Sequence, residues 1–238
     1  MGTKDRTIGN KSLKPAWSLF YLYMNCCKHT TAARFSPAPN NFYTVIIFSR
    51  HIYQKQALNR FYMDCLMRKY DSRDNIFTPS KGIVTEIKLM SFNDLWGGDQ
   101  DFYKYSAMFT FYKKLRSYLV IGLRGDTRYV DGSAPFYSYP YPDMRGLKAI
   151  QFQGEKTLQG EAELGWSFTQ RWALIGFYGA GKSYNSGIKK DTDFINTGGA
   201  GIRYLIASKL GLQMGMDIAK GPYDTAVYIQ FGSSWATK

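Results

Sequence analysis

The feature that most constrains the fold is an alternation of apolar and polar residues with a period of two, which runs from about residue 80 to residue 235. In residues 101–112 one face is apolar and the other is polar: Tyr103, Tyr105, Ala107, Phe109 and Phe111 against Lys104, Ser106 and Thr110. Successive side chains of a β-strand point to opposite faces, so this period indicates strands with one apolar and one polar face. We therefore predict an all-β chain.

Eight segments carry the alternation, and we predict a strand in each: about 82–92, 101–113, 117–130, 160–170, 172–182, 196–207, 210–220 and 224–235. A ninth strand is expected to run into residues 70–73. A strand of about eleven residues, tilted by about 40°, spans roughly 27 Å, close to the apolar band of an outer-membrane barrel. Strands of soluble proteins average about five or six residues.

The distribution of side-chain types over the two faces also bears on the class of barrel. Tyr, Phe and Trp crowd the apolar face, often near strand ends, as in the aromatic girdles at membrane interfaces. A soluble lipocalin-like barrel would have the opposite sense, with apolar side chains inside. The period of two alone does not show whether the apolar face lies inside or outside the barrel. Strand length and aromatic placement favour an antiparallel transmembrane β-barrel.

The composition of the chain changes near residue 70. Both histidines and all three cysteines precede residue 66, whereas 21 of the 23 glycines follow residue 79. We expect residues 1–69 to be an unassigned basic segment without a packed core, and residues 70–238 to form the barrel domain. Cys26, Cys27 and His29 lack the spacing and the second ligand pair of a metal site, so we expect free thiols, no metal and no cofactor.

Two sequence motifs resemble those of a known family. Residues 134–137 (Ala-Pro-Phe-Tyr), followed by Met144, Arg145, Gly146 and Leu147, are similar to the long sixth extracellular loop of the BamA/TamA family of outer-membrane barrels, also called the bacterial surface antigen family. The alternating tail with Ile229, Phe231, Gly232 and Trp235 resembles the C-terminal strand signal of bacterial outer-membrane proteins, although three residues follow the terminal aromatic. The resemblance covers about residues 70–238.

The resemblance implies a sixth loop that folds back into the barrel lumen. Its arginine, Arg145 by position in the motif, would form an ion pair there with Glu163 on the polar face of the next strand. A guanidinium suits this task because it offers several donors in a fixed fork. Two positions depart from the family pattern: Gly179 stands where a second interior Asp is usual, and Leu147 where an aromatic residue closes the motif.

The resemblance also implies a location and a function. The family inserts barrels into the outer membrane of the cell or moves proteins across it, so the expected partners are outer-membrane lipid, unfolded outer-membrane proteins and subunits of the assembly machinery. Its members usually carry periplasmic domains before a 16-stranded barrel. Eight visible strands therefore lead us to expect the C-terminal half of such a barrel, either truncated or preceded by residues from a disrupted reading frame.

Two other functional classes stay open. An eight-stranded barrel could close alone and serve as a small structural or surface-binding protein, using its Tyr-rich loop 136–141. A basic soluble nucleotide or nucleic-acid binder would suit the net charge of +13 and the match of residues 176–183 to the phosphate-loop pattern GxxxxGK[ST]. No apolar helical pattern follows that match, so we expect neither a nucleotide site nor a nucleic-acid partner.

Residues suited to catalysis are scarce. No histidine follows residue 51, no cysteine follows residue 65, and no serine lies in a GxSxG elbow. Glu161 and Glu163 lie two residues apart on one predicted strand, and a polar lumen explains them without a reaction. We therefore do not expect an enzyme.

Overall fold

A computed structural model describes residues 32–37, 42–52, 61–93, 100–185 and 194–235, with side chains from Cys65 onward. The described residues contain eleven strands: β1 (Ala32–Pro37), β2 (Phe42–Ile52), β3 (Phe61–Asp71), β4 (Gly82–Phe92), β5 (Phe102–Arg116), β6 (Leu119–Gly132), β7 (Lys156–Ser167), β8 (Trp172–Tyr184), β9 (Ile195–Ala207), β10 (Leu212–Lys220) and β11 (Thr225–Phe231). A short 3-10 helix, η2 (Phe136–Ser138), lies between β6 and β7. Within the described residues no helix is long and apolar enough to cross a membrane.

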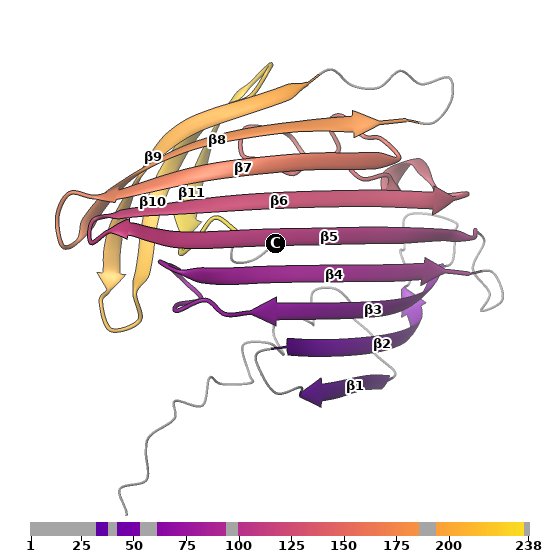
Figure 1. The fold of residues 1–238 in the computed structure, drawn as a ribbon. Coiled ribbons are helices and arrows are strands. Elements are labelled where there is room, and N and C mark those ends of the chain that lie inside the picture. Colours follow the sequence, from indigo (N-terminus) through magenta and orange to yellow (C-terminus); the bar gives the residue numbers. More distant parts are fainter. Residues whose placement is uncertain (1–31, 38–41, 53–60, 94–99, 186–193, 236–238) are drawn as a thin grey trace, which may run out of the picture.

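The strands form one sheet in which each strand pairs with its neighbours in sequence, and every pairing is antiparallel. Figure 1 shows the sheet curling, so that β10 and β11 pass behind the strands in the middle of the sheet. The all-β prediction is therefore confirmed.

β4 to β11 correspond to the eight predicted segments, and β3 is the ninth strand that was expected to run into residues 70–73. β1, β2 and most of β3 extend the sheet into the part of the chain that was assigned no core, and the boundary predicted at residue 70 falls inside β3. The continuous apolar run 45–48 in β2 hides the period of two, which explains the omission. Residues 1–31, 38–41 and 53–60 lie outside the described residues.

The apolar face of the sheet is the outer one. Large apolar side chains of five different strands are more than half exposed there: Ile87, Leu158, Tyr178, Ile218 and Ile229. Polar and charged side chains of the inner face are buried, among them Arg124 at 4% and Asp217 at 0% exposure. This arrangement is the reverse of a soluble lipocalin-like barrel and matches the sense of barrels that face lipid.

The predicted last strand is wrong at its end, where it was expected to run to residue 235. β11 ends at Phe231, and Gly232 then adopts a φ of 74°, which turns the chain away from the strand direction. Trp235 was predicted on the apolar face with Ile229 and Phe231, which are 69% and 63% exposed. It lies inside the curved sheet instead, at 5% exposure.

The indole of Trp235 occupies space that a glycine on β6 leaves open. A Cβ at Gly122 would lie only 2.8 Å from Trp235 Cζ3. The ring of Tyr112 packs at a centroid distance of 5.8 Å, and its hydroxyl is 2.9 Å from Ser233 Oγ. Residues 233–235 therefore pack against the inner face of β5 and β6.

The connection between β3 and β4, residues 72–81, links strands that are distant in the sheet. Asn75 Nδ2 donates to the carbonyl of Leu210 at 2.9 Å, and the Thr78 hydroxyl donates to the carbonyl of Gly211. Both carbonyls belong to the turn between β9 and β10. This contact holds the sheet in its curled form at the end where β9 turns into β10.

Asp74 organises the same connection. One of its carboxylate oxygens accepts backbone N–H groups of Asn75, Ser80 and Lys81, and the other accepts the Ser80 hydroxyl at 2.5 Å. Burial alone would raise the pKa of Asp74, but these hydrogen bonds outweigh it and lower the pKa below the ordinary value of 3.8. Folding therefore favours the ionised form of the Asp74 carboxyl.

We predict a specific pH dependence for the contribution of Asp74 to stability. A pKa that is lower in the folded state stabilises the protein fully above the unfolded-state pKa and loses that effect as the pH falls through the folded-state value. The difference in unfolding free energy between the wild type and Asp74→Asn should be constant from about pH 7 to pH 5 and shrink as the pH falls below the ordinary value of 3.8. Urea titrations in detergent micelles at several pH values would test it, and a pH-independent difference would contradict it.

Replacing the inward-facing tryptophan should be costly. Trp235→Ala should lower the free energy of unfolding by about 3 kcal/mol, because it leaves a cavity against Tyr112 and the β6 backbone. Trp166→Ala is the matched control, since Trp166 is 47% exposed on the outer face. Urea titration of both variants in micelles measures the difference. Equal losses would mean that Trp235 does not lie inside the sheet.

Candidate functional site

The long connection between β6 and β7, residues 133–155, places the predicted loop motif inside the curve of the sheet. Its first part packs against a small apolar cluster, with Ala134, Tyr137 and Tyr139 next to buried residues of β3 to β6. The chain then turns inward, so that Met144 and Arg145 are only 2% and 4% exposed. A loop thus brings a charged side chain into the interior.

Arg145 makes several charged contacts with the inner wall. Its Nη2 lies 2.8 Å from Glu163 Oε2 on β7, and its Nη1 lies 3.2 Å from Asp217 Oδ2 on β10. Nη1 also donates to Ser234 Oγ at 3.1 Å. Glu161 accepts the Arg145 backbone N–H at 3.4 Å and lies 3.7 Å from Nε. The predicted partner Glu163 is therefore next to the guanidinium, together with three groups that were not predicted.

The guanidinium also contacts aromatic rings. Its Cζ lies 3.5 Å from the centre of the Phe177 ring on β8 and 5.9 Å from that of Trp235. A cation over an aromatic face is attracted by the ring quadrupole, and more strongly where water is excluded. Trp235 Nε1 donates to Glu161 at 3.0 Å. Trp235 of the C-terminal segment therefore contacts the Arg145 site as well.

Further arginines extend the site across the inner face of β6 to β10. Arg203 on β9 binds both carboxylate oxygens of Asp217, with Nη2 2.8 Å from Oδ2. Arg124 on β6 lies 3.1 Å from Glu161 and 3.4 Å from Asp126. Cations therefore alternate with carboxylates, which compensates the cost of burying each charge.

Gly179 has a steric role where the resemblance implies an aspartate. A Cβ at Gly179 would lie 3.0 Å from Met144 Sδ and 3.0 Å from Thr197 Oγ1. The glycine therefore leaves room for the methionine of the loop motif. Asp217 supplies a second carboxylate from a different strand. The sequence carried a signal for it, since Asp217 is the sole acidic residue of the predicted strand 210–220.

The rest of the loop motif contacts the hairpin between β10 and β11. Gly146 adopts a φ of 94°, a conformation that favours glycine, and its N–H donates to the Tyr228 hydroxyl at 2.9 Å. Leu147 N–H donates to the Met144 carbonyl at 3.2 Å, which closes a tight turn. Lys148 forms an exposed ion pair with Asp224 at 2.9 Å. The loop thus joins β7 to the last two strands of the sheet.

The phosphate-loop match does not take the form that its motif requires. Residues 176–183, which match the phosphate-loop pattern, lie within the continuous strand β8 and cannot form a loop before a helix. Cys26, Cys27 and His29 lie outside the described residues. Within the residues that are described, no three His, Cys, Asp or Glu side chains are arranged to hold a metal ion.

Comparison with known proteins gives one kind of similarity. No protein-family model matches the chain, and no curated protein sequence matches it. Among solved structures, the chain is similar to the crystal structure of BamA from Haemophilus ducreyi lacking POTRA domains 1–3. The match has a TM-score of 0.55 and 14% sequence identity, and it covers 80% of this chain and 48% of that one. The chain therefore spans about half the length of the BamA structure and has a BamA-like barrel fold.

Proposed function

We propose that the chain is an outer-membrane β-barrel protein of the BamA/TamA type, which assists the insertion of barrel proteins or the passage of proteins across the outer membrane. The observation that carries the proposal is the buried position of Arg145, at the tip of a loop that enters the curved sheet and pairs with Glu163 and Asp217. The BamA-like fold supports it. The proposal includes no catalytic reaction, no cofactor and no nucleic-acid partner.

The outward apolar face supports a location in the outer membrane. Side chains such as Ile218 and Ile229 expose more than half of their surface to the surroundings. In water this surface would promote aggregation, whereas lipid chains would cover it. The expected partners are therefore outer-membrane lipid, unfolded outer-membrane proteins and subunits of an assembly machinery.

The buried loop supports a mechanical role for Arg145. Its contacts reach β7, β8, β10 and the C-terminal segment, so a single side chain fixes the loop against several parts of the wall. A buried ion pair need not add net stability, but removal of one partner leaves unpaired charges in the interior. The loop and the wall should therefore lose order together when Arg145 is removed.

One observation favours the second candidate, a small barrel that closes alone with a structural or surface-binding role. Asn75 next to β4 bonds to Leu210 between β9 and β10, so the two sides of the sheet meet at one end within this chain. A barrel formed mainly by β4 to β11 would need no further strands at that end. Such a protein would not assemble others.

We predict that Arg145→Ala lowers the free energy of unfolding by about 3–5 kcal/mol, since it leaves the carboxylates of Glu163 and Asp217 unpaired. Arg145→Lys should recover only part of the loss, because an ammonium lacks the planar fork. The matched control is Lys148→Ala in the same loop, whose exposed ion pair should contribute less than about 1 kcal/mol. Heat-dependent gel mobility and urea titration in micelles measure the effect. An unchanged heat-resistant band for Arg145→Ala would contradict the proposed lock.

An assembly assay separates the two candidates. We expect liposomes that contain the full chain to fold an added, urea-unfolded outer-membrane protein faster than empty liposomes do. Arg145→Ala should abolish the acceleration, and Lys148→Ala should retain it. A wild-type chain that folds in the liposomes but gives no acceleration would favour the small barrel.

A further inference from the structure

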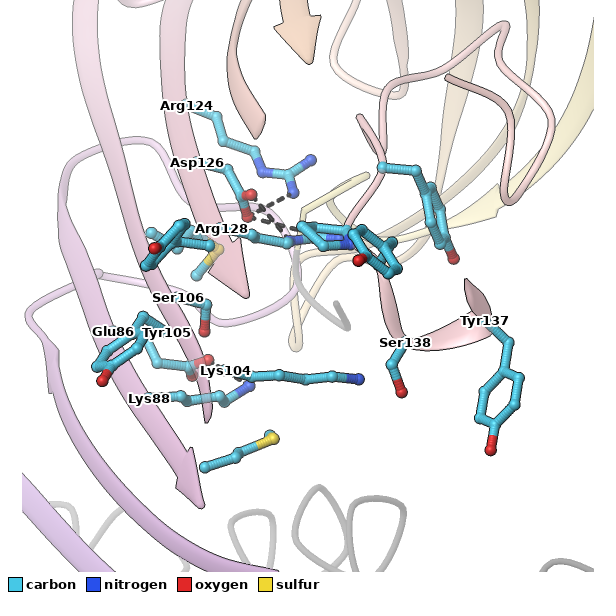
Figure 2. Close-up of a pocket in the computed structure, with 16 residues that line it drawn as sticks. Glu86, Lys88, Lys104, Tyr105, Ser106, Arg124, Asp126, Arg128, Tyr137 and Ser138 are labelled. Carbon is cyan, nitrogen blue, oxygen red and sulfur yellow. Dashed lines mark hydrogen bonds and ion pairs between the residues drawn. The ribbon is translucent and has the colours of Figure 1, made fainter. Parts of the chain in front are cut away.

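The interior holds a cavity of about 330 Å³ that is separate from Arg145. The inner faces of β4, β5 and β6 form one wall, and loop residues 137–141 form the other. Figure 2 shows charged side chains of the three strands directed into this space, with Ser138 and Tyr137 across from them. Its volume is near the lower end of the range for ligand pockets, which suits a small molecule.

The strand register places a hydroxyl between two cations on the wall. Lys88 on β4 pairs with Ser106 on β5, and Ser106 pairs with Arg128 on β6. Side chains at paired positions have Cβ atoms about 5 Å apart. Lys104 lies two residues from Ser106 on the same face. Three cations and one hydroxyl therefore gather over a small area.

The cations differ in their carboxylate partners. Lys88 Nζ lies 2.6 Å from Glu86, and Arg128 Nε lies 3.0 Å from Asp126. Lys104 is within 4.0 Å of no carboxylate in the part of the chain that the structure describes. Its ammonium lies over the stacked rings of Phe92 and Phe102, at 5.6 and 5.7 Å from their centres. Among the described residues, no acidic side chain therefore balances the charge of the Lys104 ammonium.

The charge of the lining indicates the class of ligand. Four cationic side chains line the cavity against two acidic ones, and Arg124 and Arg128 also pair with Glu161 and Asp143 outside the lining: Lys88, Lys104, Arg124 and Arg128 against Glu86 and Asp126. A phosphate monoester carries nearly two negative charges at neutral pH and has three acceptor oxygens. Lysine binds phosphate as a point charge, and the Ser106 hydroxyl can donate a hydrogen bond to it.

We propose that this cavity binds a phosphate monoester, held by Lys104 with Ser106, Lys88 and Arg128 around it. The same chemistry is offered by a soluble sugar or polyol phosphate and by the headgroup of a phosphomonoester lipid. The proposed ligand contacts do not include Arg145, Glu163 or Asp217, although Arg124 of the charged network also lines the cavity.

Calorimetric titration of the full chain, folded in phosphate-free maltoside micelles, tests the proposal. The soluble probe is glycerol 3-phosphate, with glycerol as the uncharged comparison, and the lipid probe is phosphatidic acid in nanodiscs, with phosphatidylcholine as the comparison. We expect Lys104→Met to weaken binding at least tenfold and Ser106→Ala to weaken it about threefold. Lys113→Met is the matched control, because Lys113 is an exposed lysine of the same strand that does not line the cavity.

The outcomes distinguish the source of the ligand. Lys104-dependent binding of glycerol 3-phosphate supports the proposal with a soluble ligand, and Lys104-dependent binding of phosphatidic acid alone supports it with a lipid. Binding of neither probe, or equal weakening by Lys104→Met and Lys113→Met, would overturn it. A heat-shifted gel band for each variant shows that the barrel is folded, so loss of binding is separate from failure of the proposed assembly function.

Discussion

The rest of the structure depends on the pairing of a buried guanidinium. Arg145 is 4% exposed, and a charge at that depth is tolerated only where carboxylates and hydrogen-bond acceptors surround it. Those groups come from β7, β10 and the C-terminal segment, which are far apart in the sequence. One charge therefore requires the loop, the wall and the end of the chain to meet, and each of these parts is positioned by the others.

The orientation of the sheet explains why the interior is built from charges. Because the apolar side chains face outward, the interior cannot be filled by an ordinary apolar core. It contains arginines paired with carboxylates instead, such as Arg203 with Asp217 and Arg124 with Glu161. Glycines provide the remaining space, as Gly179 does for Met144 of the loop. A sheet with apolar surface on the outside thus needs a charge-balanced interior, and the long loop contributes to it.

The period of two was enough to predict β4 to β11 and the composition of their two faces, since that period is a local property of each strand. The loop motif indicated Arg145 and Glu163. Asp217 was missed as their neighbour, because its approach depends on how far the sheet curls between β7 and β10, which no local pattern contains. Trp235 was placed on the wrong face because alternation continues through Gly232, where a positive φ ends the strand. β1 and β2 were missed, and in β2 the apolar run 45–48 obscures the period.

The cationic side chains inside the sheet fall into two groups: arginines paired with carboxylates, and Lys104. Arg124, Arg128, Arg145 and Arg203 each lie within 4.0 Å of a carboxylate, as the cost of burial requires. Lys104 faces the cavity without such a partner in the described residues. Such an ammonium contributes little to folding, since its charge is partly desolvated and no acidic side chain of the described residues compensates it. A ligand that brings two negative charges would supply the missing compensation, so the same rule that explains the Arg145 site predicts an anion beside Lys104.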